Sequence, residues 1–529
     1  MAEVARDLGV PEDALDPRGR YVAKLPPTLA GRRARGRLVL VTAITPTSKG
    51  EGKTLTTVGL AQALRRWGVR AAATLRQPSL GPLLGGKGGA AGGGRAQVEP
   101  AQLVNLHLTG DIHAVVAAQD TLAALADAHV HHGKTPTIDR LAVPRALDVN
   151  DRALRRPRVK DGDAEREVPF VIAAASESMA VLSLARSYAD LRARLGRIVV
   201  GRAPDGAPVT AEDVGARGAC AAILRDALSP NLLQTTEGAP VLVHAGPFGN
   251  VSHGHNSVLA DEVALSLADV VVTEAGFATE LGAEKYVSLV HAAAGGAAPS
   301  LAVLVVSVRA LAAHGAASGA RGDDALAAGL SNLDAHLRIL RTLGLPAVVA
   351  LNRFADDADP AVARVLDHCA KAGVAAAAHT CFADGAAGGE ALARLVLDRL
   401  DAGKAAPRAP YPSDAPLAEK LRLLATRVYG AEGVDLDPDA QASLAWLESA
   451  GFGALPPCVA KTALSISDDA KRGATPTEGW RLRVRDLRVA AGAGYVVALA
   501  GDVLLMPGLG AAPAAHRVDL LDDGTIVGV

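Results

Sequence analysis

Short apolar runs alternate with longer helical patterns through most of this chain, and this alternation constrains the fold more than any other feature. The runs are rich in Val, Leu and Ala and lack polar alternation, which is typical of strands buried on both faces of a parallel sheet. We therefore expect an α/β fold with a mainly parallel, twisted sheet and helices on both faces. The predicted strands are Leu38–Ile44, Ala71–Leu75, Phe170–Ala175, Val241–Ala245, Val270–Thr273, Ala302–Ser307 and Ala347–Asn352, and the clearest predicted helices are Leu55–Trp67 and Glu177–Leu195.

The pattern changes towards the C-terminus, which indicates further domains. The Pro-rich stretch Ala405–Pro416 has the composition of a linker. After it come a helical stretch, Pro416–Tyr429, and two strand-like runs, Leu482–Val489 and Tyr495–Leu505. Boundaries near Gly344 and Tyr429 divide the chain into a large domain (1–343) and two smaller α/β domains (344–428 and 429–529).

Composition excludes several classes of protein. The chain has 529 residues, with Lys+Arg 55 against Asp+Glu 56 and a net charge of −1, so it lacks the bulk positive charge that attracts nucleic acids or membrane surfaces. No run approaches the roughly 18 apolar residues of a membrane span, and no apolar signal segment is visible, so we expect a cytoplasmic protein. The cysteines number 4 and form no C-x-x-C pair, which predicts buried free thiols: Cys220, Cys369, Cys381 and Cys458.

The strongest local signal is the segment VLVTAITPTSKGEGKTLTTVGLAQAL. A strand ends near Ile44, a turn-rich loop follows, and Lys53 and Thr54 open an amphipathic helix, which is the layout of a P-loop in a P-loop NTPase-like sheet. In such a loop backbone N–H groups hold phosphates, the lysine reaches the β and γ oxygens, and the threonine can bind Mg²⁺. The first glycine of the general motif is Thr47 here. The predicted nucleotide-binding residues are Thr45, Thr47, Lys49, Gly50, Glu51, Gly52, Lys53, Thr54 and Leu55, with Thr54 as the metal ligand.

Two features follow the next strand. Arg76 comes directly after the strand Ala71–Leu75, so in a parallel sheet it lies beside the loop and can neutralise an anion near the transferred phosphate. The glycine-rich run Gly85–Gly94 has the composition of a linker, but its position between βαβ units favours a close backbone approach to a ligand.

Two other patterns resemble metal sites but lack residues that such sites require. Asp435, Asp437 and Asp439 imitate the start of a calcium loop, but its glycine and closing glutamate are missing, so a solvated helix start is expected. The cluster His129, His131 and His132 has no carboxylate at helical spacing and is expected on the surface.

Several blocks follow one another in a defined order. They are TPTSKGEGKTLTTVGL, RQPSLGP, KGGAAGGG, NLHLTGDIHA, NDRALR, ASESMA, SPNLLQTTEGAPVLVHAGPFGNVSHGHNS, VVTEAGFATELGAEKY, VRALAAHG, VVALNRF, AKTALSISDD, VRDLRVAAGAGYVVAL and MPGLGAAPAA. In sequence and order they resemble formate–tetrahydrofolate ligases, the enzymes that synthesise 10-formyltetrahydrofolate. The resemblance implies a homotetrameric ligase that uses ATP and Mg²⁺ to join formate to tetrahydrofolate through formyl phosphate. It also implies that the first domain binds nucleotide and formyl phosphate and that the second contributes to the folate site.

The resemblance also assigns roles to residues. Lys53, Arg76 and Asp111 are expected to be catalytic, and Phe277 and Phe382 to stack on the folate. Most of the family has Trp at the position of Phe382.

Other departures leave an alternative open. The resemblance associates a Glu beside the catalytic arginine with the response to monovalent cations, and this chain has Gln77 there, so that response is doubtful. Ser288, Val290 and Ala292 likewise replace charged family residues. A divergent nucleotide-binding paralogue with weak or no ligase activity is the alternative, whereas the C-terminal blocks argue against a different acyl-phosphate ligase.

Overall fold

The computed structural model describes residues 1–31, 36–47, 50–86, 91–161, 164–403, 405–475, 479–501 and 503–529. In these ranges one sheet of 12 strands dominates the fold, in the order β1-β2-β14-β15-β4-β16-β3-β17-β18-β19, with β6 on β14 and β5 on β6. Its strands are β1 (Asp16–Pro17), β2 (Ala23–Lys24), β3 (Arg37–Ala43), β4 (Ala71–Leu75), β5 (Gly92–Gly93), β6 (Ala96–Glu99), β14 (Asn231–Thr235), β15 (Pro240–Val243), β16 (Val270–Glu274), β17 (Pro299–Val306), β18 (Ala347–Asn352) and β19 (Ala376–His379).

All neighbouring pairs from β15 to β19 are parallel, whereas β14, β6, β2 and β1 extend the sheet in antiparallel pairs. The prediction of a mainly parallel sheet is confirmed. One predicted strand, Phe170–Ala175, is wrong as part of it. Only Phe170–Ile172 is extended, as β11, and it pairs with β8 (Arg145–Leu147) in a separate sheet. A 3₁₀ turn, Ala173–Ala175, follows, and Ser176 then caps the next helix by accepting from the N–H of Met179.

Alternate residues of the parallel strands enter two different cores, as expected for strands covered on both faces. Val39 and Val41 of β3 pack with α2 (Lys53–Arg66) and α14 (Glu390–Ala402) on one face. Leu38 and Leu40 pack on the other face. The helices there include α9 (Val258–Leu267), α11 (Asp323–Thr342) and α12 (Asp359–Lys371).

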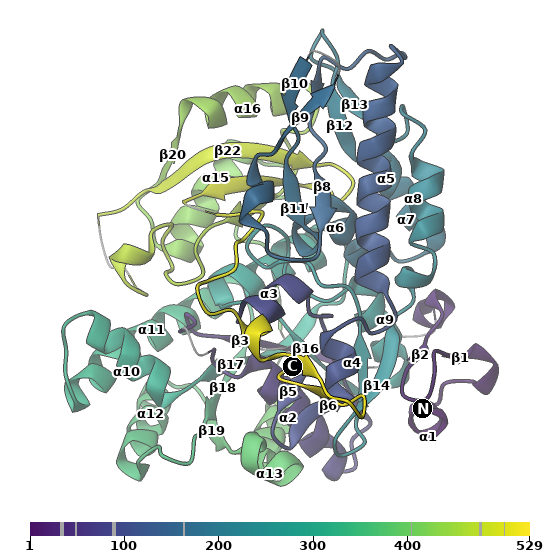
Figure 1. The fold of residues 1–529 in the computed structure, drawn as a ribbon. Helices are drawn as coiled ribbons and strands as arrows, with labels where there is room; N and C mark the ends of the chain where they lie inside the picture. Colours follow the sequence, from purple (N-terminus) through teal and green to yellow (C-terminus); the bar gives the residue numbers. More distant parts are fainter. Residues whose placement is uncertain are drawn as a thin grey trace.

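The rest of the molecule forms a second half beside the large sheet (Figure 1). The long helix α5 stands on one side of this half, and a C-terminal sheet of order β20-β22-β23-β21 lies on the other. This half contains α5 (Asp111–His131), β7 (Arg140–Leu141), β9 (Arg158–Asp161), β10 (Ala164–Glu167), α6 (Glu177–Leu184), α7 (Tyr188–Arg197), β12 (Val199–Arg202), β13 (Pro208–Thr210), α8 (Arg217–Ile223), α15 (Leu417–Leu424), β20 (Val434–Leu436), α16 (Pro438–Ser449), β21 (Pro457–Ala460), β22 (Leu482–Ala490) and β23 (Tyr495–Ala500). The remaining short elements are α3 (Leu80–Gly85), α4 (Ala101–Asn105), which contacts β6 of the large sheet, β24 (Asp519–Leu520) and β25 (Ile526–Val527). The predicted helix Glu177–Leu195 is divided into α6 and α7. Ser187 begins the second helix, because its side chain accepts a hydrogen bond from the N–H of Asp190.

The predicted boundary near Gly344 falls inside the large sheet. β17 lies before it and β18 after it, and these strands are hydrogen-bonded neighbours from Ala302↔Ala347 to Val306↔Leu351. After β19, α13 (Cys381–Gly388) and α14 pack on α2. Residues 347–402 thus extend the large sheet and the helical layer that contains α2. Their apolar side chains are buried against this sheet and these helices.

Several smaller predictions can be compared with the structure. All four cysteines are buried and free, and burial raises the pKa of Cys381 to about 12. Asp437 immediately precedes α16, as a helix start predicts. The surface expectation is wrong for His129, which is buried and bonds the carbonyl of Pro136. Within the described ranges, none of the helices is both long and apolar enough to cross a membrane.

Candidate active site

The predicted nucleotide loop joins β3 to α2 at the carboxyl edge of the parallel strands, where β3 lies between β16 and β17. Gly50 and Gly52 have φ of 73° and 83°, a left-handed conformation that glycine adopts without strain. A Cβ on Gly52 would lie 2.4 Å from the Asn352 side-chain nitrogen. Glycine therefore lets the loop pass close to β18. Lys49, one of the predicted nucleotide-binding residues, lies outside the described residues.

The buried side chain of Glu51 joins the predicted nucleotide loop to the protein interior. Its carboxylate accepts from the N–H of Thr47 at 2.8 Å and from the hydroxyl of Ser307 at 2.9 Å, and the residue is 2% exposed. Ser307 also caps helix α10 (Val308–Ala317), and Asn352 donates to the Glu51 carbonyl at 3.3 Å. The Glu51 side chain thus faces the protein interior, which suits a role in shaping the loop.

Helices α10 and α11 hold the start of the loop. The Thr45 N–H donates to His336 Nε2 at 2.8 Å, and His314 Nε2 lies 2.8 Å from the Thr45 carbonyl. Asn332 donates to the Thr45 hydroxyl at 3.0 Å. Sequence reasoning missed Asn332, His314 and His336, because they lie far from the loop in sequence and belong to no local motif.

Four polar residues meet where β3, β16 and β4 end. Thr54 donates its hydroxyl to Glu274 Oε2 at 2.7 Å, and Arg76 Nη2 lies 3.7 Å from Glu274 Oε1. Lys53 opens α2 beside them, and burial lowers the pKa of its ammonium, an effect that Glu274 and Glu51 oppose. Glu274 is 2% exposed and was missed by the sequence reasoning. A signal existed, because Glu274 is a carboxylate that ends a buried strand of the same sheet.

Arg76 is held at the end of β4. Its Nη1 donates to the Pro247 carbonyl at 3.4 Å, and its side chain is 24% exposed. Its Nε is buried without a hydrogen-bond partner in the described residues. A Cβ on Gly276 would lie 3.2 Å from Nη1, so this glycine leaves room for the guanidinium. The neighbouring Gln77 is 2% exposed, and its side-chain oxygen also lacks a described partner.

Asp111, predicted to be catalytic, is held in a buried ion pair. Both its oxygens accept from the Lys24 ammonium, at 2.9 and 3.0 Å, and one accepts from Asn231 at 2.8 Å. Both members of the ion pair are nearly inaccessible to solvent, with Lys24 2% and Asp111 3% exposed. This environment ties the start of α5 to β2 and β14.

The two predicted stacking residues occupy different environments. Phe277 has a φ of 59°, a strained value for a non-glycine residue, and its ring lies 2.9 Å from where a Cβ of Gly249 would be. Phe382 is 59% exposed at the start of α13. The ring of Phe382 lies over Gly93 and Gly94 of the glycine run, part of which, residues 87–90, lies outside the described ranges. The two phenylalanines follow β16 and β19, which are separated by three strands of the sheet.

The departures at Ser288, Val290 and Ala292 fall in the π-helix Tyr286–Ala293. Ser288 and Val290 are buried at 1% and 0% exposure, while Ala292 is exposed. A charged side chain at either buried position would need a partner inside the protein.

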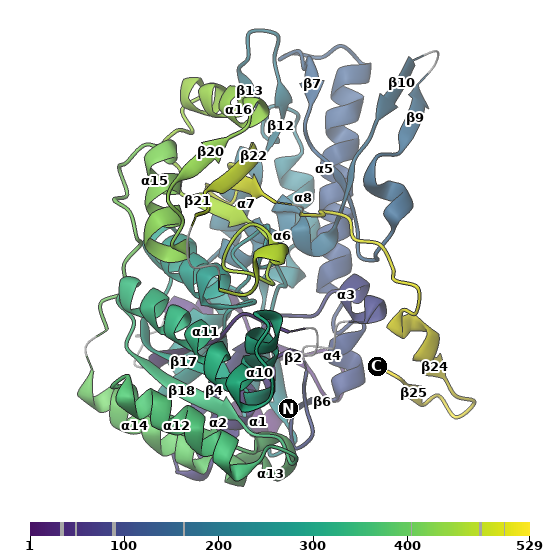
Figure 2. The same cartoon turned by 90° about the vertical axis from the view of Figure 1, so that its left-hand side faces the viewer.

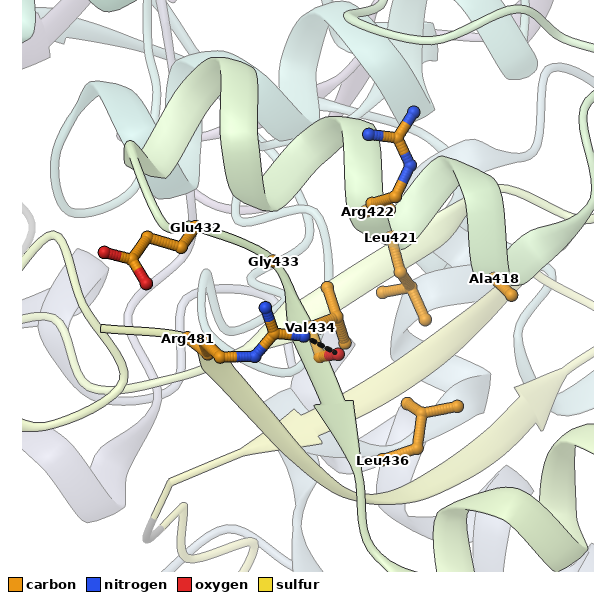
Figure 3. Close-up of a pocket in the computed structure, with 8 residues that line it drawn as sticks. All are labelled: Ala418, Leu421, Arg422, Glu432, Gly433, Val434, Leu436 and Arg481. Carbon is orange, nitrogen blue, oxygen red and sulfur yellow. Dashed lines mark hydrogen bonds between the residues drawn. The ribbon is translucent and has the colours of Figure 1, made fainter. Parts of the chain in front are cut away.

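A surface pocket of about 290 Å³ lies apart from all these residues, between α15 and β20 (Figure 3). Leu421, Val434 and Leu436 form its apolar side, and Arg481 donates to the Val434 carbonyl at its edge. Figure 2 shows α15 and β20 in the half of the molecule that does not contain α2. None of the predicted site residues lines this pocket.

Fold and site together define the class: a mixed α/β protein with a polar site at the carboxyl edge of a large, mostly parallel sheet. A sequence model described as formate–tetrahydrofolate ligase matches residues 1–529, and the chain belongs to this family.

Curated relatives agree with this assignment. A protein of a Nocardioides species is 50% identical over 545 residues, covering 100% of this chain and 97% of that protein. A Roseiflexus protein is 48% identical over 549 residues (99% and 97%), and one from Acidiphilium cryptum is 48% identical over 546 residues (100% and 97%). All three are named formate–tetrahydrofolate ligase.

Proposed function

We propose that this protein joins formate to tetrahydrofolate in an ATP-dependent reaction that yields 10-formyltetrahydrofolate, ADP and phosphate. The observation that carries the proposal is the meeting of Thr54, Glu274 and Arg76 beside the nucleotide loop. Family membership over the whole chain supports the same reaction.

We propose that the loop from Thr45 to Leu55 binds the phosphates of ATP as a P-loop. Support comes from its position between a strand and a helix N-terminus, where backbone N–H groups and the helix dipole favour anions. Lys53 at the first position of α2 would pair with the β and γ oxygens. Burial lowers the pKa of this lysine, and a bound polyphosphate would restore its preference for the charged form.

The residues present fit Mg²⁺. The hydroxyl of Thr54 and the carboxylate of Glu274 lie 2.7 Å apart, and oxygen atoms are the ligands that Mg²⁺ prefers. In the proposal Thr54 binds the ion directly and Glu274 orients the Thr54 hydroxyl. Bound Mg²⁺ would neutralise charge on the phosphates.

The proposed chemistry has two steps and needs no protein nucleophile. A formate oxygen attacks the γ-phosphorus, the bond to ADP breaks, and formyl phosphate forms. The N10 amine of the folate then attacks the formyl carbon, the C–O bond breaks, phosphate leaves and the amine loses a proton. Arg76 would stabilise the charge on the transferred phosphoryl group in both steps, a contribution on the order of 3 kcal/mol for one such donor.

We propose that Phe277 forms one wall of the folate site. Its strained backbone supports this role, because such strain is concentrated at functional sites. Phe382 remains the second candidate, supported by its exposure and its packing on the glycine run. The position of Asp111 favours a supporting role through the Lys24 pair over direct catalysis.

Three further expectations remain proposals. The boundaries at 344 and 429 and the homotetramer rest on the predicted pattern and on the family resemblance. We also propose that monovalent cations have little effect, because Gln77 is uncharged. A titration of activity with KCl tests this, and activation of severalfold would contradict it.

A coupled assay tests the main proposal. Purified protein with ATP, Mg²⁺, formate and tetrahydrofolate should release ADP and form formylated folate in equal amounts, and omission of any substrate should stop both. ATP binding without formylated product would instead indicate the nucleotide-binding paralogue.

A further inference from the structure

The nucleotide loop begins on a buried hydrogen-bonded chain that leads to the C-terminal region. The Thr45 N–H donates to His336 Nε2 at 2.8 Å, so this nitrogen must carry a lone pair. The other ring nitrogen, Nδ1, must then carry the proton, and it lies against the Thr279 hydroxyl. His336 is fully buried, at 0% exposure. The contact with Thr45 thus requires a neutral imidazole in one tautomer.

A carboxylate next to this imidazole could change its protonation. Glu280 Oε2 lies 3.7 Å from His336 Nδ1 and has no hydrogen-bond partner in the described residues. Glu280 is 0% exposed, so water does not screen its charge. An uncompensated carboxylate at this distance would favour the imidazolium.

Lys461 supplies the compensating charge. It follows β21 in the C-terminal region, and its ammonium lies 3.4 Å from Glu280 Oε1. The same ammonium donates to the carbonyls of Thr462 at 3.1 Å and Ser465 at 2.6 Å, which fix its position. Lys461 is 0% exposed.

We propose that Lys461 is a positioning residue for ATP binding: by neutralising Glu280 it keeps His336 a hydrogen-bond acceptor and so holds the start of the nucleotide loop. The inference rests on the proposed role of this loop in binding ATP. It gives the C-terminal region a part in nucleotide binding without any contact between Lys461 and the nucleotide.

The charges that surround His336 agree with this arrangement. Besides Glu280, the groups that face it are His314 of α10, Arg338 of its own helix and Lys461. Burial and these three basic groups hold the pKa of His336 well below its ordinary value. Replacing Lys461 with an apolar side chain removes one of them and leaves Glu280 unopposed. A proton would then reach Nε2, and two N–H groups would face each other at the start of the loop.

Three variants separate positioning from general damage. Lys461→Met removes the compensating charge, and the double variant Lys461→Met/Glu280→Gln removes both charges and leaves His336 neutral. Lys420→Met is the matched control, because Lys420 is also buried (1% exposed) and, within the described residues, its hydrogen bonds go to the carbonyls of Ser413 and Ala454. Affinity for a fluorescent ATP analogue is measured from pH 5.5 to 8.5, with circular dichroism to verify folding.

Lys461→Met should weaken ATP binding about tenfold at neutral pH, the effect of losing one buried hydrogen bond, and more at acid pH. The double variant should bind within about threefold of the unmodified protein, without the added pH dependence. Lys420→Met should bind normally.

The inference is overturned if Lys461→Met binds like the unmodified protein at every pH, or if the folded double variant binds as weakly as the single one. If the double variant does not fold, the single variant decides: a loss of binding by Lys461→Met that is the same at acid and at alkaline pH overturns the inference. Failure of the unmodified protein to bind the analogue would refute the proposed function itself.

Discussion

Substitution of Gly52 offers a sharp test of the nucleotide loop. Gly52 precedes α2 with a φ of 83°, and a Cβ there would lie 2.4 Å from Asn352 Nδ2. Gly52→Ala thus adds left-handed strain of about 1–2 kcal/mol. It also displaces the Asn352 amide from the Glu51 carbonyl, which costs about 1 kcal/mol more. The expected total is about 2–3 kcal/mol.

Gly68 provides the matched control at the other end of α2. Its φ of 78° is nearly the same, but nothing lies within 4 Å of the position that a Cβ would take. Gly68→Ala should therefore cost only the backbone strain of about 1–2 kcal/mol and leave the loop intact. The two variants share one perturbation and differ in the contact with Asn352.

Urea unfolding with and without Mg·ATP measures both effects in one assay. A ligand at 100 times its Kd stabilises the folded protein by about 2.7 kcal/mol, and Gly68→Ala should retain this shift. Gly52→Ala should unfold at a lower urea concentration than Gly68→Ala and lose at least half of the shift, because the displaced loop also carries Lys53. Equal unfolding midpoints and equal ATP shifts for the two variants would refute the reasoning.

Three more outcomes follow from buried or exposed side chains. Lys24→Met should destabilise the protein by about 3–5 kcal/mol, because it leaves Asp111 charged and unpaired, and adding Asp111→Leu should recover most of the loss in a denaturant titration. Phe382→Ala should leave the unfolding midpoint unchanged, since the ring is 59% exposed, but weaken tetrahydrofolate binding about two- to tenfold by calorimetry. Glu284 is fully buried, and burial raises its pKa to about 7 from 4.5, so the native protein holds the extra proton and loses stability as pH rises from 4.5 to 7. Glu284→Gln should reduce this loss by up to about 3 kcal/mol in unfolding curves measured across that range.

A specific result would contradict each of these three predictions. Equal destabilisation by the single Lys24 variant and the double variant would mean that the ion pair is not the cause. Unchanged folate affinity after Phe382→Ala would exclude this ring from the stack. A pH profile of stability that is the same with and without Glu284 would show that this carboxyl group does not titrate as described.

The strand predictions succeeded where a strand is apolar on both faces. Ala71–Leu75 and Ala347–Asn352 have the same bounds as β4 and β18, because short apolar runs between helical patterns are typical of strands buried on both faces. Phe170–Ala175 is also apolar but ends in a 3₁₀ turn before Ser176, which caps α6. An apolar pattern does not reveal where such a turn and cap begin.

In the candidate site, too, local features could be predicted from the sequence and long-range contacts could not. The places of Lys53, Thr54 and Arg76 in the fold could be predicted, because each is defined by its neighbours in the chain, at a helix start or after a strand end. The hydrogen bonds of Glu274 and His336 could not be predicted, because their partners Thr54 and Thr45 lie more than 200 positions away. The pairing of β17 with β18 across Gly344 could not be predicted either, because strand pairing depends on which edge of the sheet is free, and sequence spacing does not record this.

The sequence by itself determined the α/β class, the family, and the loop with its glycines, because periodicity, turn chemistry and ordered motifs are local properties of the chain. Only the tertiary structure decided what surrounds that loop. Glu51, Glu274 and His336 acquire their roles from contacts across the sheet and between helices, and the buried Glu280–Lys461 pair joins the loop to residues near the other end of the chain. Such contacts form because packing removes water from polar groups, and burying a polar group without a hydrogen-bond partner costs free energy. Which partner is within reach depends on the whole fold.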